Sequence, residues 1–288
     1  MKRKIHLLAI DPQNDFCDLP EHYRPLDPVT GERQSPALPV AGAHADMQRL
    51  AHLVRAGSAG ITDMTVTLDS HHRVDIAHPT FWRTGDHVAV GPFTPITAAQ
   101  VHSGQFQPRD PAALPRTLAY LDELEARGRY TLMVWPVHCE IGTWGHNVHA
   151  DLRAAYNTWE ERHLANVDIV SKGSNPWTEH YSAVQAEVPD TGDPDTQLNR
   201  RLIQRLDEAD LIIVAGEASS HCVKATTEHI VDQLSGRLDR VVLVTDCMSP
   251  VPGFEAQHAA FIDDMRGRGV RLASAGDVLP QLLDNGAG

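Results

Sequence analysis

Cys222 occupies a position where a thiol can become reactive. The apolar run at 211–214 (LIIV) is typical of a strand buried on both faces. Small and polar residues follow at 215–220, and helical spacing begins at His221 and Cys222. Backbone N–H groups and the helix dipole favour a thiolate in the first turn of a helix. Because most lone cysteines are buried and inert, this interpretation depends on the rest of the chain.

Two charged residues could assist such a thiol. Asp11 directly follows the apolar run 5–10, and Lys172 follows the apolar run 167–170. A cysteine nucleophile needs a proton acceptor and a nearby positive charge, and Asp11 and Lys172 could supply them. The small residues 217–220 could also aim backbone N–H groups at an oxyanion. Taken singly, Asp11 could be a turn cap and Lys172 a solvated lysine.

A second group of residues has the types and spacing of metal ligands. Alternate residues at the end of a strand point to the same side, so Asp69 and His71 could face one ion. His138, in the turn WPVHC, could complete a carboxylate and two-histidine site with open positions. Three further histidines remain open as competing ligands or plain surface residues: His72, His78 and His87.

The elements that must position these residues alternate between strand and helix. Strands are expected at 5–10, 61–68, 167–170, 211–214, 240–245 and 269–273, and helices at 41–56, 142–156, 198–209 and from 221 onward. This order predicts an α/β fold whose parallel strands end in one shared crevice. We expect one domain over 1–288, with irregular insertions at about 17–39 and 79–115.

Composition excludes several functional classes. The net charge of −13 and the absence of a basic block argue against nucleic acid and anionic membranes as partners. Four widely spaced cysteines without a CxxC pair suggest neither a disulfide framework nor a zinc ribbon. No apolar run approaches the roughly 20 residues that span a bilayer. The basic start MKRK leads into an apolar stretch too short for a signal peptide, so a cytoplasmic protein is expected.

Several short blocks resemble the isochorismatase-like cysteine hydrolases, and among these the nicotinamidases. They occur in family order and span nearly the whole chain. The blocks are DPQNDF at 11–16, TLDSHH at 67–72, WPVHCEIGTWG at 135–145, SKG at 171–173 with YSA at 181–183, and the nucleophile segment at 216–223. The resemblance implies a three-layer α/β/α fold with about six central, mostly parallel strands.

The resemblance also implies roles for individual residues. Asp11 would be the base, Cys222 the nucleophile and Lys172 its partner. A cis peptide would join Glu217 to Ala218, and the N–H groups of Ala218 and Cys222 would form the oxyanion hole. Zinc, manganese or iron would be bound by Asp69, His71 and His138, and the substrate ring would lie among Phe16, Trp135 and Tyr181. A dimer or tetramer would be usual for such a protein.

The implied reaction is hydrolysis of nicotinamide to nicotinate and ammonia through a Cys222 thioester. Departures from the family pattern leave the substrate open. Ser70 replaces the usual tryptophan, and residues 72–74 replace the usual diproline. The alternatives are another amide or ureide hydrolase, isochorismatase proper, a catalytically silent binding protein, or an enzyme whose metal makes a hydroxide nucleophile. The last predicts an active Cys222→Ala variant and an inactive Asp69→Ala variant.

Overall fold

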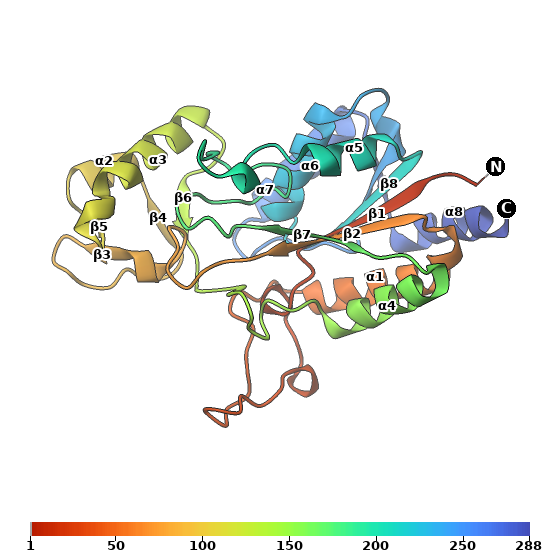
Figure 1. Cartoon of the computed structure of the whole chain (residues 1–288), viewed down its shortest axis with the longest axis horizontal. Coiled ribbons are helices and arrows are strands. Elements are labelled where there is room, and N and C mark those ends of the chain that lie inside the picture. The colour runs from red at the N-terminus through yellow and green to blue at the C-terminus, as the bar shows by residue number, and fades with distance from the viewer. Residues whose placement is uncertain (1) are drawn as a thin grey trace.

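A six-stranded parallel sheet forms the centre of the computed structural model, which describes residues 2–288 (Figure 1). The strand order is β10-β9-β8-β1-β2-β7, so β1 and β8 lie side by side in the middle. The prediction of about six parallel strands is confirmed. The strands are β1 (Ile5–Ile10), β2 (Asp63–Asp69), β7 (Asp168–Lys172), β8 (Leu211–Gly216), β9 (Val241–Val244) and β10 (Arg271–Ala273).

Helices cover both faces of this sheet, which makes the three layers that the sequence predicts (Figure 1). On one face α1 packs against α4 and α8, and on the other face α6 packs against α7 beside α5. Apolar residues of α1 at helical spacing face the sheet, which explains why this amphipathic stretch folds as a helix. The helices are α1 (Ala43–Gly57), α4 (Ala150–His163), α5 (Arg200–Asp207), α6 (Cys222–Gln233), α7 (Glu255–Gly267) and α8 (Ala275–Ala287).

Strand register brings the polar residues at the carboxyl ends together. Ile10 of β1 is paired with Gly216 of β8, and Asp69 of β2 with Lys172 of β7. Every residue of β1 and β8 is buried, so a slip in register would break a continuous apolar layer. Gly216 adopts φ +125, and a Cβ there would lie 2.0 Å from the Ile10 carbonyl oxygen. Only glycine therefore permits the chain to turn so closely past β1.

The stretch 79–115, expected as an irregular insertion, is structured. It contributes to a second cluster of buried side chains, including Trp82, Leu121 and Leu132, apart from the main core. The interpretation failed because strands of only three residues, two of them containing proline, carry no readable periodicity. The helices and strands of this stretch and of the residues that follow it are β3 (Trp82–Thr84), β4 (Thr94–Ile96), α2 (Ala98–His102), β5 (Phe106–Pro108), α3 (Leu114–Arg127) and β6 (Leu132–Val134).

The stretch 17–39 is irregular, as expected, and projects from the body of the molecule (Figure 1). Its two ends return to the same place, because the Leu38 N–H donates to the Asp15 carbonyl at 3.0 Å and the Val40 N–H to the Phe16 carbonyl at 3.0 Å.

None of the helices within residues 2–288 is both long and apolar enough to cross a membrane.

The helix expected at 142–156 begins later, at Ala150. The preceding backbone cannot be helical because its carbonyl groups serve the loop after β1. Gly145 accepts a hydrogen bond from the Asp15 N–H at 3.0 Å, and Asn147 accepts one from the Asn14 N–H at 2.9 Å. A contact between segments distant in sequence therefore replaces the local hydrogen bonds of a helix turn.

The close approach at Gly216 predicts a large loss of stability on substitution. We expect Gly216→Ala to lower the free energy of unfolding by about 2–4 kcal/mol, because backbone strain and a clash add together. Gly236→Ala is the matched control, since Gly236 has φ +84 but no atom within 4 Å of an added Cβ. Chemical denaturation of both variants measures the difference. Equal losses in the two variants would contradict the role given to the Ile10 contact.

Candidate active site

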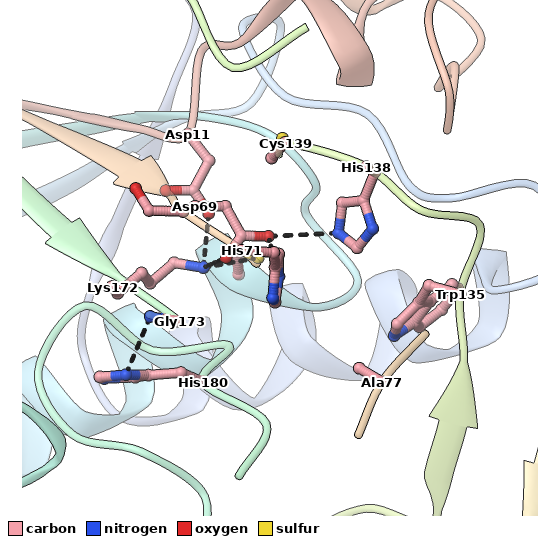
Figure 2. Close-up of polar contacts among 12 residues, drawn as sticks. Asp11, Asp69, His71, Ala77, Trp135, His138, Cys139, Lys172, Gly173 and His180 are labelled. Atoms are coloured by element: carbon pink, nitrogen blue, oxygen red, sulfur yellow. Dashed lines mark hydrogen bonds and ion pairs between the residues drawn. The ribbon is translucent and has the colours of Figure 1, made fainter. Parts of the chain in front are cut away.

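Three residues from three different elements meet at the carboxyl edge of the sheet. Asp11 follows β1, Lys172 ends β7 and Cys222 begins α6. The Lys172 ammonium lies 2.9 Å from Asp11 Oδ2 and 3.5 Å from Cys222 Sγ. It also lies 3.0 Å from Oδ1 of Asp69 (Figure 2). All four side chains are buried, so the chemistry that the sequence predicts for them is available in one water-poor place.

The electrostatics of this group favour a charged lysine and a mobile proton. Burial disfavours the ammonium of Lys172, but the carboxylates of Asp11 and Asp69 outweigh it and raise the pKa of Lys172 well above its ordinary range. Burial raises the pKa of Asp11, while Lys172 and a hydrogen bond from Thr67 lower it. Burial also raises the pKa of the Cys222 thiol. Asp11 and Cys222 are thus two proton acceptors of raised affinity beside one fixed positive charge.

The turn between β8 and α6 supplies backbone donors beside the thiol. The peptide bond between Glu217 and Ala218 is cis, as the resemblance implies. The N–H groups of Glu217 and Ser219 donate to the Ile10 carbonyl at 2.8 Å and to the Ser249 carbonyl at 2.9 Å. Within residues 2–288, the N–H groups of Ala218 and Cys222 donate to no acceptor. Both remain free to stabilise an oxyanion.

The predicted metal ligands also come together. His71 Nε2 lies 3.1 Å and His138 Nε2 lies 3.3 Å from Asp69 Oδ2 (Figure 2). The ligand atoms of His71, His78 and His138 all lie within 4.8 Å of one another. His78 is therefore the one histidine among the three left open that joins the group. His72 and His87 are exposed and lie outside it.

The hydrogen bonds of these histidines suit a metal ion. Nδ1 of His71 faces Asp75 Oδ2 at 3.1 Å, that of His78 faces a backbone carbonyl at 3.2 Å, and that of His138 faces the Pro136 carbonyl at 2.8 Å. An Nδ1–H that donates outward leaves the Nε2 lone pairs of His71 and His138 for an ion, whereas Nε2 of His78 faces Nδ1 of His138 at 3.3 Å. Nε2 of His71 is buried, and Asp69 Oδ2, although 3.1 Å away, is not placed to form a hydrogen bond with it. The donor set of one carboxylate and imidazole nitrogens fits zinc, manganese or iron.

Asp75 was not expected at this site. Of the regular elements, only a helix brings side chains four residues apart into contact. The segment between His71 and Asp75 folds as a tight turn, so this spacing gave no signal. The Asp75 carbonyl accepts the His78 N–H at 2.9 Å, and its Oδ1 accepts the Ala77 N–H at 2.9 Å. Asp75 thereby orients one candidate ligand and holds the turn that delivers another.

A small cavity opens beside Cys222 and the metal group. The three aromatic residues predicted to hold the substrate ring, Phe16, Trp135 and Tyr181, all line it. The Trp135 indole N–H donates to the Tyr181 hydroxyl at 3.0 Å, which fixes both rings. The remaining lining residues are Leu38, Asp69, His138, Glu179, Ala218, His221, Cys222 and Val251.

His221 is a pocket residue that the sequence analysis missed, although its place next to Cys222 was a usable signal. Its ring lies 5.0 Å from that of Trp135 and 5.2 Å from that of Tyr181. Burial lowers the pKa of His221 to about 3, so the ring is neutral near pH 7. His221 therefore adds a flat, uncharged wall to the cavity.

Solved structures with the same architecture belong to amide hydrolases. The nicotinamidase/pyrazinamidase from Acinetobacter baumanii matches with TM-score 0.60 at 19% identity, over 96% of this chain and 98% of that one. The chain has the nicotinamidase fold. Yeast nicotinamidase bound to the inhibitor nicotinaldehyde matches with TM-score 0.61 at 18% identity, over 94% of this chain and 99% of that one.

A third match is to a protein with zinc bound. Pyrazinamidase of Pyrococcus horikoshii in complex with zinc matches with TM-score 0.50 at 16% identity, over 94% of this chain and 99% of that one. At such identities the matches show the nicotinamidase fold alone. No protein-family model and no curated protein sequence matches the chain.

The geometry predicts that His78 and Asp75 matter for metal affinity. We expect His78→Ala and Asp75→Asn each to weaken zinc binding by about 10- to 100-fold, because one removes a ligand and the other loosens His71. Titration calorimetry with zinc on the metal-stripped protein measures this. His72→Ala is the control, and an affinity loss there equal to that of His78→Ala would contradict the assignment.

Proposed function

We propose that the chain hydrolyses a small aromatic carboxamide, with nicotinamide as the leading substrate, to the carboxylate and ammonia. The contact of the Lys172 ammonium with both Asp11 and Cys222 carries this proposal. A buried thiol, a buried carboxyl and a fixed ammonium at one sheet edge serve nucleophilic attack on a carbonyl. The adjacent aromatic cavity and free backbone donors suit a flat amide.

In the first half of the reaction, Cys222 Sγ attacks the amide carbon while its proton passes to Asp11. Lys172 stabilises the developing thiolate, and the N–H groups of Ala218 and Cys222 receive the negative charge on the carbonyl oxygen. Asp11 then returns the proton to the nitrogen as the C–N bond breaks. Ammonia leaves, and the acyl group remains as a thioester on Cys222.

In the second half, Asp11 removes a proton from water, which attacks the thioester carbonyl. The C–S bond breaks, the carboxylic acid leaves, and the Asp11 proton returns to Cys222. Asp69, His71, His78 and His138 would hold a divalent metal, for which we propose zinc. When bound, this ion would accept a ring nitrogen of the substrate and so orient the ring.

The nearest alternative is another amide or ureide hydrolase with the same reacting groups. Leu38, which lies within the projecting segment 17–39, lines the cavity, so this segment contributes to the choice of substrate. A silent binding protein would have no need of the buried Lys172 beside Asp11 and Cys222. The homo-oligomeric state and a cytoplasmic location stay predictions.

Ammonia release from nicotinamide, pyrazinamide and a panel of small amides and ureides tests this function. We expect turnover of nicotinamide, with a loss of at least about 10³-fold in Cys222→Ala and Lys172→Met, because single members of such a unit are indispensable. Metal-stripped protein should lose activity and regain it with zinc. An active Cys222→Ala variant would instead support a metal-bound hydroxide as the nucleophile.

A pH profile tests the role of Asp11. The base must be ionised, so kcat/KM falls as the pH drops through the pKa of Asp11, which burial raises above the ordinary value of about 3.9. The Thr67 hydrogen bond favours the ionised form, so Thr67→Val should move this acidic limb to higher pH. Thr65→Val is the control, since Thr65 pairs with His6 instead. An acidic limb that stays in place in Thr67→Val argues against Asp11 as the base.

A further inference from the structure

A second pair of buried carboxyl groups lies behind the turn that carries the oxyanion donors. Glu217, within that turn, is 0% exposed, and Asp46 of α1 is 2% exposed. Ser249 contacts both, since its N–H donates to Glu217 Oε2 at 3.1 Å and its hydroxyl to Asp46 Oδ2 at 2.5 Å. The Ser249 carbonyl also accepts the Ser219 N–H at 2.9 Å. These contacts join α1, the turn and the segment after β9.

A side-chain hydrogen bond joins the two carboxyl groups, and within residues 2–288 Arg49 is the one cation that pairs with either of them. Arg49 pairs with Asp46 Oδ1. Oε1 of Glu217 meets no hydrogen-bond donor anywhere in residues 2–288. Two ionised carboxylates cannot face each other in a buried site without a proton or a second cation between them. One of the two carboxyl groups must therefore carry a proton. Glu217 is the one that carries it, because within residues 2–288 it pairs with no cation.

Most charged or titratable groups around Glu217 favour its protonated form or are neutral, and Arg49, which pairs with Asp46, is the exception. Burial, followed by Asp46 and Asp18, raises the pKa of Glu217 well above its ordinary value. Burial raises the pKa of both neighbouring thiols, so Cys17 and Cys247 carry no charge near neutral pH. The charged and titratable groups around Glu217 and these two thiols include Asp18, Asp46, Arg49 and Asp246.

We propose that Glu217 is a neutral acid that donates a hydrogen bond to Asp46 and is thereby the positioning residue of the oxyanion turn. Glu217 directly precedes Ala218, whose N–H is one of the two free donors. Ionisation of Glu217 would set two negative charges against each other and push the turn away from α1. Donors that stabilise an oxyanion act only when they are held in place, so this displacement would reduce turnover without weakening ground-state binding.

Infrared spectroscopy tests the proton itself. The wild-type spectrum at neutral pH should contain the carbonyl stretch of a buried carboxylic acid, which shifts in D₂O and is absent from Glu217→Gln. Glu208→Gln, at an exposed position, is the matched control and should leave this band unchanged. If the wild type and Glu217→Gln have the same spectrum in this region, Glu217 is ionised and the proposal is overturned.

Kinetics test the positioning role, and this part rests on the proposed function. We expect Glu217→Leu to lower kcat about 10- to 100-fold at unchanged KM, and Glu217→Gln, whose amide can still donate to Asp46, to restore most of it. The wild type should lose kcat at alkaline pH through a step that Glu217→Gln lacks. A loss in Glu217→Leu that appears in KM instead, or that glutamine does not restore, overturns the positioning role. A protein with the infrared band but no amide hydrolysis refutes the proposed function and supports the protonated Glu217.

Discussion

The buried ammonium of Lys172 is the charge on which the site depends. Placing a charge in a protein interior costs several kcal/mol unless ionised partners and hydrogen bonds compensate it. Here Asp11 and Asp69 do so at 2.9 and 3.0 Å, and each comes from the end of a different strand. The lysine therefore holds three strand ends together at the place where it also meets the Cys222 thiol.

This arrangement links the reacting residues to the metal group. Asp69 contacts Lys172 through Oδ1 and the two histidines His71 and His138 through Oδ2. Burial favours the neutral form of Asp69, but its contacts with His71, Lys172 and His138 outweigh burial and hold the pKa of Asp69 well below its usual range. One carboxylate thus serves both halves of the site, and a bound cation would compete with Lys172 for its charge.

A different solution operates behind the turn that precedes α6. Around Lys172 opposite charges compensate one another, whereas Glu217 and Asp46 are like groups and a single arginine pairs with Asp46. A shared proton is the remaining way to bury such a pair. The surroundings of Lys172 and those of Glu217 therefore respond differently to pH, since one depends on an ion pair and the other on a neutral acid.

The sequence by itself determined the centre of the sheet, because β1, β8 and β9 are buried on both faces and appear as apolar runs. It also determined which residues stand at the strand ends, since Asp11, Asp69 and Lys172 directly follow or close those runs. It failed for β3, β4 and β5, which are too short for periodicity, and for residues 142–149, whose carbonyl groups bond to the loop after β1.

Only the tertiary structure decided which histidine joins the metal group and how the turn after β8 is supported. The sequence offered no ground for choosing between His72 and His78 as ligands. In the structure, a turn held by Asp75 buries His78 and leaves His72 exposed. Glu217 and Asp46 are far apart in the chain and carried no joint signal. Contacts of this kind depend on how α1 and the segment after β9 pack against the sheet, and no local pattern encodes that packing.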